Sequence, residues 1–114
     1  MSAQPFLHTL HAVDPATASD AQKAILDQAV KAVGFLPNMY ANMVNAPAVL
    51  STYLHGYGLF RSESGLKPAE QEVVFLAVSQ VNGCQYCLAA HTVIGGMVGF
   101  KPEQIIEIRQ VQEM

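Results

Sequence analysis

The two cysteines of this 114-residue chain fall in one Cys-x-x-Cys motif, Cys84 and Cys87, and His91 follows four residues after the second cysteine. Residues three and four positions apart share one face of an α-helix, so a helix that begins at Cys84 would carry all three side chains on one stripe. Two thiols beside an imidazole are the groups that nucleophilic or redox thiol chemistry needs. The spacing therefore predicts a reactive dithiol next to an acid–base histidine.

A position in the first turn of a helix favours the thiolate form of Cys84. Unpaired backbone N–H groups and the positive end of the helix dipole both stabilise negative charge at that position. The three-residue separation also predicts a Cα–Cα distance of roughly 5 to 6 Å between the cysteines, which a disulfide bond tolerates. We therefore expect Cys84 and Cys87 to form a disulfide that opens and closes with little backbone movement.

Glu72 is predicted to join this group across a helical hairpin. The Asn-Gly pair at 82–83 indicates a turn, and Glu72 and His91 lie roughly 15 and 12 Å from it along antiparallel helices. Glu72 also shares its helix face with apolar residues, so burial would demand a polar partner, and His91 lies at nearly the same height. Glu70 points to the other side and is interpreted as an ordinary acid of the first helical turn.

Two segments of the sequence resemble the signature of a known family. Glu72-Val-Val-Phe-Leu-Ala-Val-Ser is followed by Asn82-Gly-Cys-Gln-Tyr-Cys-Leu-Ala-Ala-His91. Together they are similar to the motif of the AhpD-like alkylhydroperoxidases within the carboxymuconolactone decarboxylase superfamily. The resemblance is strong over residues 65–100 and extends more weakly from 35 to 107. It implies an all-α fold, with an antiparallel helix hairpin that carries the Cys-x-x-Cys site, and a homotrimer or homohexamer.

The resemblance also implies a reaction, the reduction of hydrogen or alkyl hydroperoxides through a cysteine sulfenic acid. Cys87 would be the attacking cysteine, and Cys84 the resolving cysteine that also donates a proton and closes the disulfide. Glu72 and His91 would relay protons to and from Cys87. The reductant would be a dithiol, typically a lipoyl-type carrier. The best-studied branch of the family has a histidine just before the second cysteine, where this chain has Tyr86.

Other interpretations of the same residues remain open. The cysteines could be small buried apolar side chains, or Cys84, Cys87, His91 and Glu72 could hold zinc. Structural zinc sites usually recruit a second, separated Cys or His pair, which this chain lacks, so we expect neither a metal nor a cofactor. The alternative function is a carboxymuconolactone decarboxylase-like enzyme or a non-peroxidatic dithiol redox or interaction protein. Decarboxylation needs no thiol pair, so the intact motif favours the peroxidase.

The elements that must position these residues are helices. Apolar residues spaced three and four apart, bounded by prolines and glycines, predict helices over residues 19–33, 37–45, 47–61, 68–81, 84–97 and from 102 to the C-terminus. No segment shows the alternating pattern of a strand for long enough to predict one. Residues 1–17 are predicted to form an N-terminal arm, and residues 18–114 a single helical domain.

The composition restricts the partners of the protein. The hydrophobic content of 51% is above the usual apolar share, the charged fraction of 13% is below the usual one, and the mean hydropathy is +0.23. No apolar run, however, reaches the length of about eighteen residues that a membrane span needs. We therefore expect the surplus to be buried in a homo-oligomer, chiefly by residues 37–61 and the helices beside the site. Six scattered basic residues and a net charge of −3 argue against nucleic acid. The N-terminus lacks a secretory signal, which predicts a cytoplasmic protein.

Overall fold

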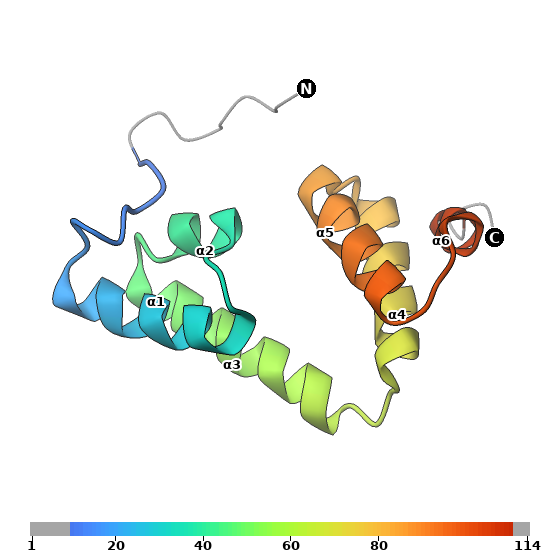
Figure 1. Cartoon of the computed structure of the whole chain (residues 1–114), viewed down its shortest axis with the longest axis horizontal. Helices are drawn as coiled ribbons and strands as arrows, with labels where there is room; N and C mark the ends of the chain where they lie inside the picture. The colour runs from blue at the N-terminus through green and yellow to red at the C-terminus, as the bar shows by residue number, and fades with distance from the viewer. Residues whose placement is uncertain (1–9, 111–114) are drawn as a thin grey trace. The chain divides into compact units, whose positions relative to one another are not determined.

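The computed structural model describes residues 10–110, and every regular element in this part of the chain is an α-helix (Figure 1). The helices are α1 (Asp20–Val33), α2 (Asn38–Met43), α3 (Pro47–Glu63), α4 (Pro68–Asn82), α5 (Gln85–Met97) and α6 (Pro102–Arg109). The predicted all-α fold is confirmed. Among these helices, none combines the length and apolar character that crossing a membrane would require.

The chain divides into two compact units, one up to Leu59 and one from Phe60 onward, so the division falls inside α3. Each unit has its own cluster of buried apolar side chains. The prediction of a single domain from residue 18 onward stays a prediction.

The first unit is organised by α1, whose two ends are both capped. Ser19 and Gln22 form a capping box, in which the Ser19 hydroxyl accepts the Gln22 N–H at 3.2 Å and the Gln22 side chain accepts the Ser19 N–H at 3.0 Å. Gly34 ends the helix in the left-handed region, at a φ of 94°. The inward face of α1 meets residues of α2 and α3 in a core formed by Leu26, Ala29, Tyr40, Val44 and Leu50.

Part of the N-terminal segment is attached to this core. Val13 is half-buried and packs against the cluster, and its N–H donates to the Ala41 carbonyl at 2.8 Å. The Asn45 side chain donates to the His11 carbonyl at 2.7 Å. The segment from residue 10 to 17 contains no helix, and the packing of Val13 was not foreseen because a single apolar residue has no periodicity. Residues 1–9 of the predicted arm lie outside the described residues.

The second unit contains the last turn of α3 together with α4, α5 and α6. Leu76, Leu88 and Ile105 form its buried cluster, with one residue from each of the three complete helices. Gly95 of α5 is buried at this junction, and a Cβ atom placed on it would lie 3.4 Å from Ile105 Cδ1 and 3.7 Å from Leu76 Cδ1. A Cβ atom would thus already be in van der Waals contact with both side chains, so little room remains for a larger side chain at this position.

A short turn joins α4 to α5 and sets the position of the cysteines. Gly83 adopts a φ of 66°, a left-handed conformation that favours glycine, and ends α4. The Cys84 N–H then donates to the Ser79 carbonyl at 3.0 Å, which ties the start of α5 to the last turn of α4. The two helices pack on each other, so the Asn-Gly pair makes the hairpin that its sequence predicts.

Candidate active site

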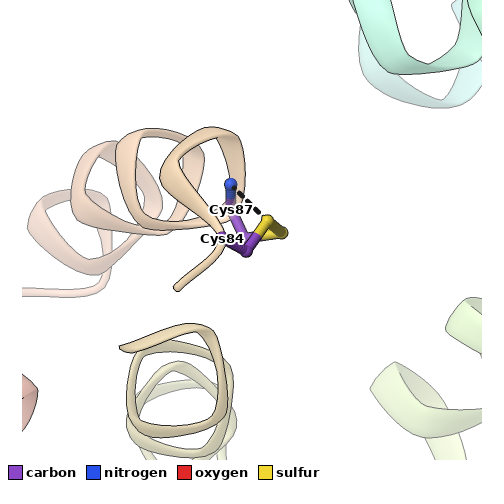
Figure 2. The surroundings of a disulfide bond; sticks show 2 residues. All are labelled: Cys84 and Cys87. Atoms are coloured by element: carbon purple, nitrogen blue, oxygen red, sulfur yellow. Dashed lines mark hydrogen bonds between the residues drawn. A yellow bond between two sulfur atoms is a disulfide. The ribbon is translucent and has the colours of Figure 1, made fainter. Parts of the chain in front are cut away.

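Cys84 and Cys87 are joined by a disulfide at the start of α5 (Figure 2). Their Cα atoms lie 5.3 Å apart, within the range that the three-residue spacing predicts. Both residues are half-buried, so their sulfur atoms are not sealed inside the unit. The pair occupies the end of the hairpin turn, where the helix presents its first backbone N–H groups.

The helix begins one residue later than predicted, which makes Cys84 its N-cap. Cys84 has extended backbone angles, with φ −82° and ψ 98°, and the first helical residue is Gln85. Its Sγ accepts the backbone N–H of Cys87 at 3.2 Å, the dashed contact in Figure 2. This is the role that a serine or aspartate oxygen usually plays at an N-cap. The Cys87 N–H donates here to a disulfide sulfur, and the stabilisation of a Cys84 thiolate at the helix start stays a prediction.

Glu72 and His91 meet across the hairpin. Glu72 Oε1 lies 2.6 Å from His91 Nδ1, and the Glu72 side chain has no exposed surface while that of His91 is 12% exposed. The similar distances of Glu72 and His91 from the turn, calculated along the two helices, thus correctly predicted that these residues are in contact. A buried carboxylate without partners would be costly, and this hydrogen bond satisfies one of its oxygens.

The contact between Glu72 and His91 fixes which ring nitrogen is available for chemistry. An ionised carboxylate can only accept hydrogen bonds, so His91 Nδ1 must carry the proton that it donates to Glu72. In a neutral imidazole the other nitrogen, Nε2, is then the acceptor. His91 can therefore take up a proton at Nε2 while the carboxylate stabilises the resulting imidazolium, the arrangement of an oriented general base.

The second oxygen of Glu72 is held by Arg61, from the last turn of α3. Arg61 Nη1 lies 2.6 Å from Glu72 Oε2 and forms a salt bridge with it. Phe75, one turn after Glu72 on α4, contacts both partners of the carboxylate. Its ring stacks on His91 with centroids 4.3 Å apart and planes 8° apart, and the Arg61 guanidinium carbon lies 4.7 Å from its centroid.

Sequence reasoning missed Arg61 and the stacking by Phe75. A buried acid next to a histidine needs a further hydrogen-bond donor, and that need is a signal for a cation close to Glu72. The chain has six basic residues, and spacing alone does not select one of them, because Arg61 belongs to a different helix and reaches Glu72 through a long side chain. Glu70, in contrast, behaves as an ordinary acid of the first helical turn, and its carboxylate accepts the Lys67 N–H at 2.7 Å at the start of α4.

The cysteines lie at the start of the helix that carries His91, with Tyr86 between them in the sequence. His91 lies one helical turn after Cys87 on α5, so these two residues share a face of the helix, whereas Cys84 precedes the helix as its N-cap. Tyr86, at the position of the family's additional histidine, is 45% exposed. Within residues 10–110, no group of three or more His, Cys, Asp or Glu side chains is placed to hold a metal ion.

The second unit is all-helical, with a Cys-x-x-Cys pair at the start of one helix of a hairpin and a Glu–His pair across the hairpin. This arrangement is the one that the resemblance to AhpD-like proteins predicts, and the family comparison agrees with it. The model of the carboxymuconolactone decarboxylase family matches residues 47–114, more than half of the chain, and the chain belongs to this family. It is similar to the solved structure of the alkylhydroperoxidase AhpD core from Rhodospirillum rubrum, with 29% sequence identity and a TM-score of 0.76. That alignment covers 92% of this chain and 81% of the other. No curated protein matches the sequence.

Proposed function

We propose that the protein is a thiol peroxidase that reduces hydrogen peroxide or alkyl hydroperoxides with the Cys84–Cys87 dithiol. The observation that carries the proposal is the combination of a disulfide at the start of α5 with the Glu72–His91 hydrogen bond one turn further along. A disulfide confined to one helical turn closes a very short loop and contributes little to stability, so a redox role explains it better than a structural one. The similarity to an alkylhydroperoxidase core supports the same reaction.

In the first step, the reduced enzyme transfers the thiol proton of Cys87 to Nε2 of His91. The Cys87 thiolate attacks the terminal oxygen of the hydroperoxide, so that an S–O bond forms and the O–O bond breaks. The sulfur is oxidised by two electrons to sulfenic acid. The alkoxide or hydroxide that leaves takes the proton back from His91 and departs as alcohol or water.

In the second step, Cys84 attacks the sulfur of the Cys87 sulfenic acid. The S–S bond forms, the S–O bond breaks, and the hydroxide that leaves combines with the Cys84 thiol proton to give water. The disulfide in the structure corresponds to this product. A dithiol reductant then restores both thiols by exchange and becomes a disulfide itself. A lipoyl-type carrier is the reductant that the family resemblance favours.

The functional assembly we propose is a homo-oligomer, a homotrimer or homohexamer by family resemblance. The chain has an apolar surplus, and several valines of α4 are exposed, including Val78 at 53% and Val81 at 64%. Exposed apolar side chains at neighbouring positions of one helix are typical of a surface that another subunit covers.

The experiment that tests the function is mass spectrometry of reduced protein after one equivalent of peroxide. The proposal requires sulfenic acid or the Cys84–Cys87 disulfide to form. Dithiol added afterwards should regenerate the two thiols. A control variant with both cysteines changed to serine should leave the peroxide unconsumed. If the wild-type thiols stay free to alkylation under peroxide while the protein remains folded, the peroxidase assignment is wrong.

A further inference from the structure

Among the described residues, Arg61 is the one cation in contact with the Glu72–His91 pair, and several hydrogen bonds hold it in place. A single nitrogen, Nη1, donates to Glu72 Oε2 at 2.6 Å and to Gln71 Oε1 at 2.8 Å. The Arg61 side chain is 24% exposed, whereas Glu72 has no exposed surface. The guanidinium therefore enters the unit from its surface and ends on a fully buried carboxylate.

The neighbours of Arg61 restrict its movement. Gln71 is itself buried, and its Nε2 donates to the Arg61 carbonyl at 3.0 Å and to the Leu66 carbonyl at 3.0 Å. Gln71 thus holds both the backbone and the guanidinium of Arg61. The Phe75 ring lies under the guanidinium carbon at 4.7 Å and adds a cation–π contact.

The two carboxylate oxygens of Glu72 are bonded to different partners, and this arrangement restricts the orientation of His91. With Oε2 bonded to Arg61, only Oε1 is directed to the imidazole, so the carboxylate cannot exchange its oxygens or turn away from Nδ1. Phe75 fixes the plane of the same imidazole by stacking. The orientation of His91 therefore depends on a group that does not touch it.

Charge gives Arg61 a second effect. Arg61 and Glu72 together are neutral, so when His91 holds the thiol proton the three residues carry one net positive charge, opposite to the new thiolate. Without Arg61, the remaining Glu72 carboxylate and His91 imidazolium would together be neutral at that moment. The positive charge of Arg61 also repels a further positive charge placed on the Glu72–His91 pair.

We propose that Arg61 is a positioning residue that sets the orientation and the charge balance of the Glu72–His91 pair. The inference rests on the proposed function for its catalytic meaning, but the effect on proton binding is independent of any reaction. It differs from a structural role in its dependence on charge. A merely structural arginine would affect stability without moving the pH at which His91 takes up a proton.

Within residues 10–110, the charged and titratable groups that contact the pair or share its helices at the site come from three helices. They are Arg61 on α3, Glu72 itself on α4, and on α5 His91 with the cysteines, which do not titrate while joined as a disulfide. The fourth helix in contact, α6, contributes Arg109, whose Nε donates to Gln80 Oε1 at 2.9 Å, two turns along α4 from Glu72. Arg109 has no acidic partner in that contact and provides a matched control.

The test compares Arg61→Gln, which keeps a hydrogen-bond donor but loses the charge, with Arg61→Lys, which keeps the charge. Arg109→Gln is the control. The pH midpoint of the His91 ring signals is followed by NMR in oxidised protein, with His91→Gln to assign them. We expect the midpoint to move to higher pH in Arg61→Gln, to stay near the wild-type value in Arg61→Lys, and to be unchanged in Arg109→Gln.

A kinetic measurement connects this effect to the reaction. In reduced protein, Arg61→Gln should slow the first oxidation by hydrogen peroxide by up to about 10²-fold, the loss expected when a reacting group is misplaced by about 1 Å. It should also move the acidic limb of the pH–rate profile to higher pH. Arg61→Lys should restore most of the rate and most of the position of this limb. The inference is overturned if Arg61→Gln and Arg61→Lys give the same His91 midpoint. A wild-type enzyme inert to peroxide would overturn the proposed function instead, while the NMR result would still decide the role of Arg61.

Discussion

Glu72 Oε1 and His91 Nδ1 lie 2.6 Å apart although the two residues are separated by 19 positions and belong to different helices. The contact joins α4 to α5 within one turn of the cysteines. It also gives a buried carboxylate a specific partner and gives the imidazole a defined tautomer.

The two cysteines should have different phenotypes. Cys87→Ser should abolish peroxide consumption, because it removes the proposed nucleophile. Cys84→Ser should allow one oxidation and trap Cys87 as sulfenic acid, which further peroxide carries on to sulfinic acid. Single-turnover reactions with a sulfenic acid probe and mass spectrometry distinguish these products. Appearance of the trapped sulfenic acid on Cys84 in the Cys87→Ser variant would reverse the two roles.

Loss of the acid–base pair should slow the reaction without removing the nucleophile. His91→Ala and Glu72→Gln should each reduce the rate of the first oxidation by about 10² to 10⁴-fold, the range expected when general acid–base catalysis is lost. Stopped-flow measurement of thiol oxidation gives this rate directly. A zinc site predicts a different result, in which substitution of any of the four residues releases a stoichiometric metal ion and lowers stability together.

The exposed face of α4 should belong to an interface between subunits. Val78→Glu places a charge at a position that is 53% exposed in the single chain, and it should lower the assembly state at micromolar protein concentration. Light scattering measures the mass of wild type and variant. Glu103→Gln, on α6, should leave the mass unchanged. A wild-type protein that is a monomer in this measurement contradicts the oligomer proposal.

Close packing at Gly95 should make this position sensitive to size. Gly95→Val adds atoms where even a Cβ would lie 3.4 Å from Ile105 Cδ1, so we expect a destabilisation of about 1 to 3 kcal/mol from overpacking. Gly96→Val is the matched control, because it adds the same side chain to the same helix where nothing lies within 4 Å of a Cβ. Urea unfolding of both variants separates the packing effect from the lower helix propensity of valine.

The helices could be predicted well because their signals are local. Prolines at the starts of α3, α4 and α6, glycines after α1 and α4, and apolar spacing fixed most bounds to within two residues. The shared face of Cys87 and His91 and the approach of Glu72 are also local, because one tight turn relates the two helices that carry them. These features need only helix geometry and one hairpin.

Arg61 could not be derived in this way. Its contact with Glu72 depends on how α3 meets α4 and on a guanidinium at the end of a flexible side chain, neither of which has a sequence period. The first helical residue of α5 was also misplaced by one, because spacing does not distinguish an N-cap from the first residue inside a helix. The roles of Glu72, Cys84, Cys87 and His91 in catalysis remain predictions that the variants above will test.

The Cys84 sulfur takes part in both the disulfide and the N-cap of α5. The atom that closes the disulfide is also the acceptor for the Cys87 N–H at the head of α5. Alanine at position 84 would therefore weaken the helix as well as remove the thiol, at a cost of about 1 kcal/mol for a lost N-cap, whereas serine supplies an oxygen that preserves the cap. Comparison of the serine and alanine variants can thus separate what this sulfur contributes to folding from what it contributes to electron transfer.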